Sequence, residues 1–549
     1  ALAFARYLPM YGWRPVVLTV DAAWATNRDD DLLRLVPHRL EVVRTASLEG
    51  KPASSSRRGP EESAAQERNA SGRAGGRGSE PTLPREVGAA DCGPHMRERV
   101  AKWLVPAWSR RQLGHLRRFP DAHLGWLPFA IAAAWRRQDV DLVYSSSGPF
   151  TCHLVGLILS KLLRKPWVAE LRDGWYLWNR AIFADYPGWR GPIERRLEAA
   201  VIRSADRVLL VTERMAAAFR SQYADVPADH FRVVTNGFDP RQVTVTADHG
   251  DATSLLAARA GQGCVDGAVW DASPATNRSG AAELMERRGV LERASEATDT
   301  GEQERGSVRE PIEALDSLGA ESAVEAWNPD RQTDTANEVF EVVHAGALYY
   351  GRSITAFLDA ADRLMRKPVA VDSVPGAQFQ VQFGKKFRLT LIGSLDATAG
   401  AELARHPIGP YIRVEGQLSH ATVMQRLRRA SLLLLVANTT RLAEATVPGK
   451  LFEYLAIGRP ILALAPRASS TADVLAHTGG AWLAPGDDVD AITAALREAF
   501  ESWQAGRMIG PDPRQVARYS RTRLAGELAR VFEEVLASRA AGRAGADVS

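Results

Sequence analysis

The chain has 549 residues, of which 45% are hydrophobic and 24% are charged, and a formal net charge of +4 at pH 7. This size and apolar content allow two hydrophobic cores of ordinary size. The three cysteines, Cys92, Cys152 and Cys264, are far apart and lack metal-ligand spacing, which argues against a disulfide framework and suits a reducing cytosol. No apolar run is long enough to span a bilayer, because Leu154 to Leu163 is too short and predicts a buried helix.

Short apolar runs with strand character alternate with helical patterns along the chain. This alternation predicts an α/β fold of two Rossmann-like, doubly wound domains, each with a parallel sheet. In the first half, the predicted strands are Val16 to Val20, Leu142 to Ser145, Trp167 to Leu171, Val208 to Val211 and Phe231 to Val234. In the second half, they are Val342 to Ala345, Leu389 to Ile392, Ile412 to Val414, Leu432 to Val436, Ile461 to Leu464 and Ala481 to Leu483.

Two polar segments interrupt this pattern. From about Glu49 to Cys92 the chain has almost no large apolar residues, which predicts a disordered surface insert. From about Arg241 to Asn337 acidic residues outnumber basic ones, and only Ala281 to Ala294 shows a weak helical pattern. We therefore expect the second segment to be an enlarged acidic linker between the two domains.

These patterns predict the domain boundaries. The N-terminal domain spans residues 1–240, the linker 241–337, and the C-terminal domain 338–515, and a final helix and tail follow at 516–549. Within Arg523 to Leu536 the apolar residues form one stripe, which predicts a helix with one core-facing side. These residues are Leu524, Leu528, Val531, Phe532 and Val535.

The segment Val447 to Pro466 is the most informative for chemistry. It predicts a helix that opens at Pro448 and Gly449, directly after a strand and loop, and that stops at Gly458. Such a helix points its free N–H groups and the positive end of its dipole at a ligand in the crevice, and phosphate suits that position. Glu453, one turn inside the helix, is placed to accept hydrogen bonds from a ribose diol. An ordinary strand-loop-helix unit is the alternative.

The segment resembles the donor site of family 4 glycosyltransferases, retaining enzymes of the GT-B fold whose bacterial subgroup reads Pro-Ser-Lys-Leu-Phe-Glu-Tyr. The resemblance covers most of the chain outside the two polar segments and implies two Rossmann-like domains that face a central cleft. It also implies that the final helix packs back across the N-terminal domain. The other similar segments, in chain order, are Tyr7 to Val20, Asp141 to Phe150, Pro166 to Trp175, Val233 to Asp239 and His344 to Arg352.

The resemblance also bears on the start of the chain. Ala1 lies inside the predicted first helix, so the first strand and the glycine-rich turn of the N-terminal domain are missing from the pattern. We expect a fragment or a truncated gene, which affects part of the acceptor side of the site.

Transfer of a sugar from a nucleoside diphosphate leaves negative charge on the departing diphosphate. The resemblance implies that side-chain cations and helix N-termini neutralise this charge without a metal or other cofactor. Arg352 is the first candidate, because it follows the Gly346 turn and its guanidinium fits two phosphate oxygens. Lys450, next to Gly449, is the second candidate, and a solvated surface lysine is its alternative.

This chain departs from the family pattern at two positions. The family's two phosphate-loop cations fall at Ala347 and Arg352, so one cation is absent. Its paired glutamates fall at Ala445 and Glu453, and Glu444 is one place early. The sequence therefore assigns no residue to the contact with the donor sugar.

Two Asp-x-Asp sequences are candidates for a metal site. Asp488-Val-Asp490 follows Pro-Gly-Asp and predicts a capped helix start, whereas Asp139-Val-Asp141 precedes a strand. We favour these structural roles and expect no metal.

The candidate acceptor-side residues follow two strands of the N-terminal domain. Arg172, Asp173 and Trp175 come after the strand that ends at Leu171, and Asp173 is the candidate to orient or deprotonate an acceptor hydroxyl. An ion pair between Arg172 and Asp173 is the alternative. Ser146, in the Ser-Ser-Ser-Gly end of the preceding strand, offers a hydroxyl to a sugar or phosphate, and a plain turn is the alternative.

Basic residues alternate with tryptophan and leucine from Met96 to Phe119. This composition suits an anionic membrane surface, and many members of the family act on lipid-linked acceptors. No motif that reads nucleic acid accompanies the segment, so we expect no nucleic-acid partner. A solvated helical hairpin is the alternative.

The sequence therefore predicts a cytoplasmic, retaining, metal-independent glycosyltransferase that is a candidate for peripheral attachment to the inner face of the cell membrane. Its expected partners are a nucleotide-sugar donor and a glycan or lipid-linked acceptor in cell-surface polysaccharide synthesis. Two other functions stay open, a nucleotide-sugar epimerase and a catalytically silent nucleotide-sugar-binding protein. An NAD-dependent oxidoreductase is disfavoured, because no Gly-x-Gly-x-x-Gly follows any of the strands.

Overall fold

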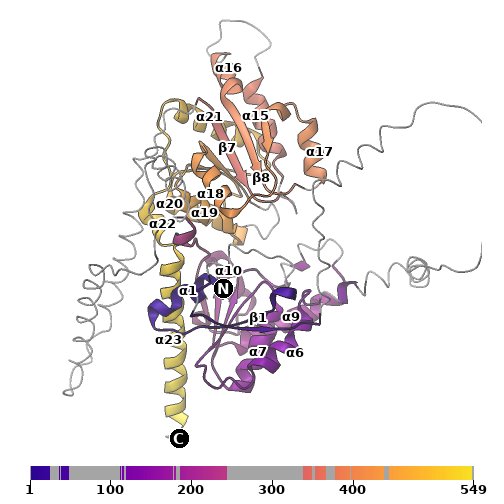
Figure 1. The fold of residues 1–549 in the computed structure, drawn as a ribbon, viewed down its shortest axis with the longest axis vertical. Helices are drawn as coiled ribbons and strands as arrows, with labels where there is room; N and C mark the ends of the chain where they lie inside the picture. Colours follow the sequence, from indigo (N-terminus) through magenta and orange to yellow (C-terminus); the bar gives the residue numbers. More distant parts are fainter. Residues whose placement is uncertain are drawn as a thin grey trace, which may run out of the picture. The chain divides into compact units, whose positions relative to one another are not determined.

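The computed structural model describes residues 2–24, 36–37, 39–48, 112, 114–116, 119–176, 179–180, 186–243, 338–348, 353–366, 377–395, 397–437 and 444–546. The chain separates into two compact units, one made of Ala1–Asp239 and Thr333–Ser549 and the other of Pro240–Gln332. The strands and helices described below all belong to the first unit (Figure 1).

The second half of this unit is built on a six-stranded parallel sheet, the C-terminal sheet. Its strands lie in the order β12-β11-β10-β7-β8-β9, so the chain order reverses between β7 and β10. In doubly wound sheets such a reversal opens a crevice at the carboxyl ends of the two strands, where ligands bind. The strands are β7 (Phe340–Ala345), β8 (Phe387–Ile392), β9 (Ile412–Val414), β10 (Leu432–Val436), β11 (Ile461–Leu464) and β12 (Ala481–Ala484).

Helices cover both faces of the C-terminal sheet, which explains why its central strands are apolar at successive positions. Val342 and Leu434 belong to the core on one face, with side chains of α15, α16 and α21. Val343 and Leu433, their neighbours along the strands, belong to the core on the other face, with α18, α19 and α20. The helices are α15 (Thr355–Met365), α16 (Ala377–Lys386), α17 (Ala397–Arg405), α18 (His420–Arg429), α19 (Gly449–Ile457), α20 (Ser470–Thr478), α21 (Val489–Gln504) and α22 (Pro513–Ala517), with the 3-10 turn η6 (Gly409–Tyr411).

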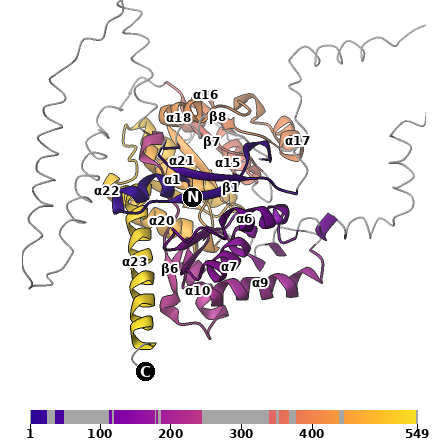
Figure 2. The same ribbon diagram turned by 60° about the horizontal axis from the view of Figure 1, so that its bottom comes forward.

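The first half of the unit contains a four-stranded parallel sheet in the order β3-β4-β5-β6 and a separate parallel pair, β1 and β2. Trp167 and Ala169 of β4 face a core shared with α9 and α10. Helices α6 and α7 lie side by side, as Figure 2 shows, and share a core of their own. The elements are β1 (Val16–Val20), β2 (Glu41–Thr45), β3 (Val143–Ser146), β4 (Trp167–Leu171), β5 (Arg207–Leu210), β6 (Phe231–Val233), α1 (Leu2–Tyr7), α6 (Leu127–Ala134), α7 (Thr151–Leu163), α9 (Arg190–Ser204) and α10 (Glu213–Gln222), with the 3-10 turns η1 (Leu8–Tyr11), η2 (Ala22–Trp24), η3 (Leu124–Trp126) and η4 (Ala228–His230).

The last helix, α23 (Arg521–Ala546), packs against the first half of the unit beside α1 (Figure 1). Its buried residues share a core with Phe4 of α1, Val168 of β4 and Leu209 of β5. The segment after β6 closely approaches the residues before α23 at Gly237, where a Cβ atom would lie 2.1 Å from the Tyr519 carbonyl oxygen. Glycine at this position therefore allows the end of the N-terminal sheet to pack against the start of α23. The buried residues of α23 are Leu524, Ala525, Leu528, Ala529, Val531, Phe532 and Val535.

The predicted α/β fold with parallel sheets is confirmed. The predicted strands all form, with ends that differ by at most two residues, and β2 is an additional strand that the sequence patterns did not indicate. Helix α19 begins at Gly449 after Pro448 and ends at Gly458, which adopts the left-handed conformation expected of a C-terminal cap. The two polar segments, including the weak helical pattern at 281–294, lie outside the described residues apart from 241–243.

Candidate active site

The candidate donor site lies at the switch point of the C-terminal sheet, where β7 ends at Gly346 and α19 begins after β10. Gly346 has a φ of +123°, a conformation that L side chains rarely adopt. A Cβ atom at Gly346 would lie only 2.1 Å from Nζ of Lys450, so the lysine side chain occupies the space that the missing side chain leaves. The Lys450 Nζ atom is buried. The structure therefore brings together Gly346 and Lys450, which were predicted separately, and rejects the solvated-lysine alternative.

Glycines also follow β8, which adjoins β7, and β9, the next strand along the sheet. Gly393 after β8 and Gly416 after β9 both have positive φ, and the Gly393 amide donates to the Gly416 carbonyl oxygen at 2.6 Å. A Cβ atom at Gly393 would lie 2.8 Å from the carbonyl carbon of Gly346. Because no side chain separates these turns, the backbone of this edge packs closely beside Lys450.

Helix α19 is fixed to β7 by a hydrogen bond in its second half. The amide of Ala345, the last residue of β7, donates to the Tyr454 hydroxyl oxygen at 2.8 Å. Burial raises the pKa of Tyr454, so the phenol stays neutral. This contact holds α19 in register with β7, and Lys450 lies one turn before Tyr454 on the same helix.

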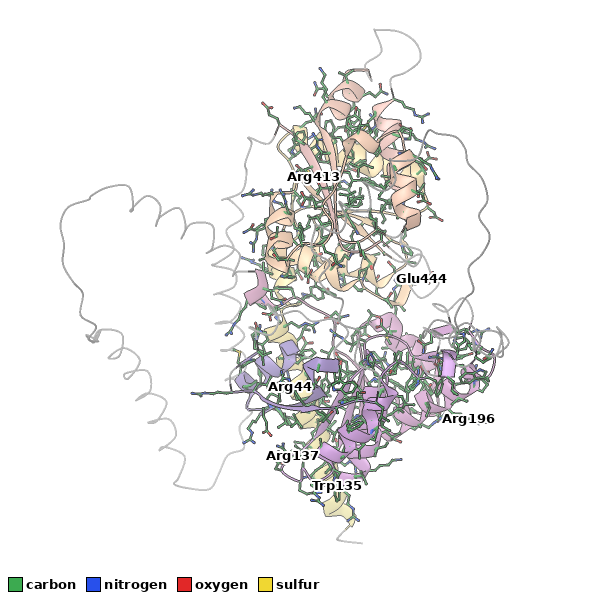
Figure 3. All side chains as sticks on the ribbon, turned by 45° about the vertical axis from the view of Figure 1, so that its right-hand side comes forward. Arg44, Trp135, Arg137, Arg196, Arg413 and Glu444 are labelled. Carbon is green, nitrogen blue, oxygen red and sulfur yellow. The ribbon has the colours of Figure 1, made fainter. Side chains whose placement is uncertain are left out.

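The structure describes two of the three remaining residues considered for the donor site. Glu453 is half-buried on α19, and its Oε1 lies 3.8 Å from Nε2 of His420 at the start of α18. Glu444, labelled in Figure 3, is exposed four residues before Pro448. Arg352 lies outside the described residues, so its role stays a prediction.

The two Asp-x-Asp sequences hold local structure. Asp488 caps α21, because its carboxylate accepts a hydrogen bond from the Ala491 amide at 2.9 Å, as predicted. Asp139 pairs with Arg137 at 2.8 Å, and Arg137 is labelled in Figure 3. Within the described part of the chain, no group of three His, Cys, Asp or Glu side chains is arranged to hold a metal ion.

The acceptor-side candidates gather where β3 and β4 end. Glu170 of β4 is buried, and its Oε2 accepts hydrogen bonds from Ser146 at 2.5 Å and from Tyr144 at 2.6 Å. Burial alone would raise the pKa of Glu170, but the positive charge of Arg172 and these two hydroxyls contribute to holding it below the usual value. Ser146 is therefore tied to a buried carboxylate.

Arg172 and Asp173 follow β4 directly, and both side chains are half-buried. Arg172 donates through one guanidinium nitrogen to Oδ1 of Asn236 at 2.8 Å, and its backbone amide donates to the Ser147 hydroxyl. The alternative of an Arg172–Asp173 ion pair is therefore not what the structure shows. Burial raises the pKa of Asp173, and the charge of Arg172 opposes this rise. A carboxylate with a raised pKa beside a strand end suits proton transfer.

Trp175 occupies a different environment from the one expected of an acceptor contact. Its side chain is fully buried and stacks on Phe150 at a centroid distance of 5.0 Å. His153, also buried, contacts the Ser145 hydroxyl through Nδ1 at 2.8 Å, and burial lowers its pKa to about 4. Trp175 and His153 are therefore core residues behind the edge that carries Arg172 and Asp173.

The sequence patterns missed Arg521, the first residue of α23. Its Nε donates to the Gly237 carbonyl oxygen at 3.1 Å, next to Asn236, which binds Arg172. Arg521 precedes the apolar stripe of α23 by three residues at Leu524 and by seven at Leu528. This spacing places Arg521 on the same face of the helix as the buried apolar residues, and it is the sequence feature that could have pointed to Arg521.

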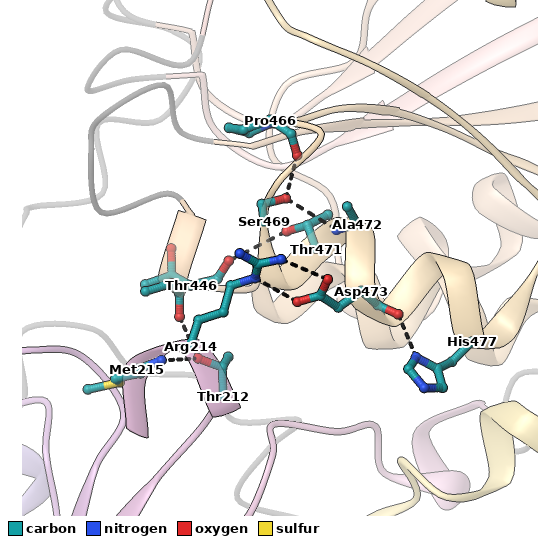
Figure 4. A network of polar contacts seen from close by, with 11 residues as sticks. Thr212, Arg214, Met215, Thr446, Pro466, Ser469, Thr471, Ala472, Asp473 and His477 are labelled. Carbon is teal, nitrogen blue, oxygen red and sulfur yellow. Dashed lines mark hydrogen bonds and ion pairs between the residues drawn. The ribbon is translucent and has the colours of Figure 1, made fainter. Parts of the chain in front are cut away.

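A second polar network connects the start of α10 in the first half to α20 and to the loop before α19 in the second (Figure 4). The Thr212 hydroxyl donates to the Ala445 carbonyl oxygen at 2.6 Å, in the loop that leads to Lys450. Arg214 forms a bidentate pair with Asp473 of α20, at 2.7 Å and 3.0 Å. The loop before the candidate donor site is therefore anchored to the N-terminal half of the unit.

Removing the Thr212 hydroxyl is expected to destabilise the chain. Thr212 is buried, and its Oγ1 also accepts from the Met215 amide at 3.1 Å as the N-cap of α10. Thr212→Ala loses both hydrogen bonds and should lower the free energy of unfolding by about 1–3 kcal/mol. Thr212→Ser keeps the hydroxyl and should stay within about 1 kcal/mol of the wild type. Chemical denaturation measures both, and equal losses for the two variants would contradict the assignment.

Comparison with known families identifies the chain. The family described as Glycosyltransferase Family 4 matches residues 89–242, and the family described as Glycosyl transferases group 1 matches residues 339–502. The two matched segments together span more than half of the sequence and contain the strand ends described above. The chain is a glycosyltransferase whose first half matches family 4 and whose second half matches group 1. Its two Rossmann-like halves give this glycosyltransferase the GT-B fold, as the sequence resemblance implied.

The chain is also similar to several solved structures at low sequence identity. HepE of Anabaena, in complex with UDP and glucose, is 15% identical, with a TM-score of 0.43 over 74% of this chain and 81% of its own. Sucrose-phosphate synthase of Thermosynechococcus elongatus is 12% identical, with a TM-score of 0.45 over 76% and 79%. A glycosyltransferase of Rickettsia africae is 9% identical, with a TM-score of 0.47 over 97% and 93%. No curated protein matches the sequence.

Among the described residues, no helix has both the length and the apolar character that a bilayer span requires. The basic segment 96–119 lies mostly outside the described residues, so its contact with an anionic membrane stays a prediction.

Proposed function

We propose that this glycosyltransferase takes its sugar from a nucleoside diphosphate donor whose diphosphate binds between Gly346, Lys450 and the N-terminus of α19. The observation that carries the proposal is the position of the buried Lys450 ammonium against Gly346, at the switch point of the C-terminal sheet. A cation, close backbone turns and a helix N-terminus at one place provide the charge and the N–H donors that a leaving diphosphate needs. Arg352, in the loop after Gly346, is the further cation of this proposal.

We also propose which side chains act during the transfer. With Lys450 and the helix N-terminus holding the charge, no metal is required at the diphosphate. Glu453, half-buried on α19, is the candidate ligand of the ribose hydroxyls. Asp173 orients the acceptor hydroxyl or takes its proton, and the sugar is transferred with retention of its anomeric configuration. The acceptor is a glycan or a lipid-linked glycan of cell-surface polysaccharide synthesis, presented at the inner face of the membrane.

A panel of UDP, GDP, ADP and TDP sugars tests the donor class. The expected result is that one of these nucleotide sugars raises the melting temperature of the full chain and that the free nucleoside does not. The outcome against the proposal is that no nucleotide sugar stabilises the chain. Turnover of the stabilising sugar nucleotide is then followed with and without acceptor, with chelator present throughout. Conversion of the sugar without acceptor would indicate an epimerase, and loss of all transfer in chelator would overturn the metal-free course.

A further inference from the structure

A histidine and a glutamate from two different helices lie close together in the C-terminal half of the unit. His420 is the first residue of α18, which follows β9, and Glu453 lies one turn inside α19, which follows β10. Nε2 of His420 lies 3.8 Å from Oε1 of Glu453. Among the residues that the structure describes, no other basic side chain lies within 4.0 Å of the Glu453 carboxylate. The pair therefore lies at the same edge of the sheet as the candidate donor site.

The packing of α18 on α19 does not depend on this pair. Met424 of α18 and Leu455 of α19 belong to one buried apolar core, which already joins the two helices. The side chain of His420 is 35% exposed and that of Glu453 is 40% exposed. A pair of charges with this much exposure contributes little to stability, because water screens it. A role in ligand binding explains the position of the pair better than a role in folding.

The backbone around the pair leaves room for a ligand. Gly449 lies four residues before Glu453 and therefore on the same face of α19. A Cβ atom added at Gly449 would meet no described atom within 4 Å, and the same holds at Gly416, which follows β9. Because helical side chains lean toward the N-terminus of their helix, the Glu453 side chain covers the turn that begins at Gly449. Its carboxylate therefore borders open space on one side and His420 on the other.

We propose that His420 is a positioning residue that holds the Glu453 carboxylate toward the ribose of the donor. As a consequence, the chain selects ribonucleoside diphosphate sugars over their 2′-deoxy forms. This inference rests on the proposed function, in which Glu453 is the ligand of the ribose hydroxyls. The two oxygens of a carboxylate accept from both hydroxyls of a diol when the carboxylate is held in one orientation. A donor without the 2′-hydroxyl loses one of these charge-assisted hydrogen bonds.

His420 acts on the orientation of Glu453. A long, partly exposed glutamate side chain loses rotational freedom when a ligand binds, and that loss reduces affinity. The imidazole offers an N–H donor at Nε2 in its cationic form and in one neutral tautomer. A shift of about 1 Å brings Nε2 to hydrogen-bond distance of Oε1. His420 thereby restricts Glu453 before the donor arrives, so its removal should weaken donor binding without slowing the transfer itself.

The test measures binding of UDP, GDP and ADP, and of the 2′-deoxy form of each, to the full chain by calorimetry. For the diphosphate that binds most tightly, the 2′-deoxy form should bind the wild type about tenfold more weakly. His420→Ala should weaken binding of the ribose form by about threefold to tenfold and reduce the difference between the two forms to about twofold. In transfer assays the KM for the donor should rise by the same factor, while kcat stays within about twofold of the wild type.

Three further variants separate positioning from other effects. Because His420 acts through Glu453, the double variant with His420→Ala and Glu453→Ala should bind the diphosphate as Glu453→Ala does. His420→Gln keeps an N–H donor and should stay within about twofold of the wild type. His477→Ala is the matched control and should bind as the wild type does. His477 is an exposed histidine of α20 whose Nδ1 contacts the carbonyl oxygen of Asp473 in its own helix.

Three outcomes would overturn the inference while a nucleoside diphosphate still binds. They are equal or tighter binding of the 2′-deoxy form by the wild type, unchanged affinity in His420→Ala, and a double variant that binds more weakly than Glu453→Ala. Thermal unfolding checks each variant. If His420→Ala does not fold, His420→Leu, which keeps the bulk without a ring nitrogen, replaces it with the same expected result. Absence of binding by every diphosphate would instead be a failure of the proposed function, and the inference would fall with it.

Discussion

Replacing Lys450 with alanine is expected to weaken the binding of nucleoside diphosphates by about tenfold to a hundredfold. It should also lower kcat/KM for transfer by about a hundredfold to a thousandfold, because the ammonium faces charge that grows as the diphosphate leaves. The structural reason is that the Lys450 ammonium is buried against the Gly346 turn at the switch point of the sheet. Calorimetry with UDP, or with whichever diphosphate the donor panel selects, measures the first effect.

The controls for Lys450 separate charge from folding. The free nucleoside should bind Lys450→Ala and wild type alike, because it has no phosphate. Lys385→Ala, at an exposed lysine of α16, should change neither nucleotide binding nor transfer. Gly346→Ala reaches the same site by another route, since its Cβ would displace the Lys450 ammonium and strain the backbone. Unchanged diphosphate affinity in Lys450→Ala would remove the ammonium from the proposed donor site.

The donor side could be predicted from the sequence because its signals are local. The Pro448-Gly449 helix start and the Gly458 stop each depend on residues within a few positions, and α19 begins and ends where they indicate. The contact of Lys450 with Gly346 could not be predicted in this way. It joins residues about a hundred positions apart and arises only because β10 lies beside β7 in the sheet.

The acceptor side was harder to predict, because tertiary contacts decide its details. Trp175, four residues beyond the end of β4, was expected at the cleft, but its ring stacks on Phe150 in the core. Arg172 was expected to pair with its neighbour Asp173 or to face a ligand, and it reaches Asn236 after β6. A pattern along one strand does not show which partner another strand brings to the same edge.

The C-terminal helix completes the N-terminal half of the unit by polar contacts as well as by its apolar stripe. Phe238 and Ser520 form a parallel bridge, and the Arg521 amide donates to the Phe238 carbonyl oxygen at 2.8 Å. The Tyr11 hydroxyl donates to the Thr522 carbonyl oxygen at 3.0 Å. Since these contacts fix the first turn of α23, they also fix Arg521 beside Arg172.

Asp173→Asn is expected to lower kcat by about a hundredfold or more while leaving the fold intact, since a positioned base typically contributes about 10²–10⁴-fold. Asparagine has the shape of aspartate but does not accept a proton at neutral pH. Because burial raises the Asp173 pKa in the folded chain, its ionised carboxylate costs stability at pH values above its ordinary pKa. The melting temperature of Asp173→Asn at neutral pH should therefore equal or exceed that of the wild type.

The pH profile distinguishes a base from a structural carboxylate. As a base, Asp173 must be ionised, so kcat/KM of the wild type should fall as the pH is lowered through its raised pKa, above the range of an ordinary aspartate. In Asp173→Asn this acidic limb should be lost or displaced. Asp141→Asn, at an exposed aspartate before β3, should keep both the rate and the limb.

A small effect in Asp173→Asn would assign the proton differently. In a retaining reaction at one face of the sugar, the leaving phosphate can accept the proton of the acceptor hydroxyl. If kcat falls less than about tenfold and the acidic limb persists, Asp173 has no role as a base, and the limb belongs to the diphosphate held at Lys450. Lys450→Ala should then shift the limb, because loss of a nearby cation raises the pKa of a phosphate.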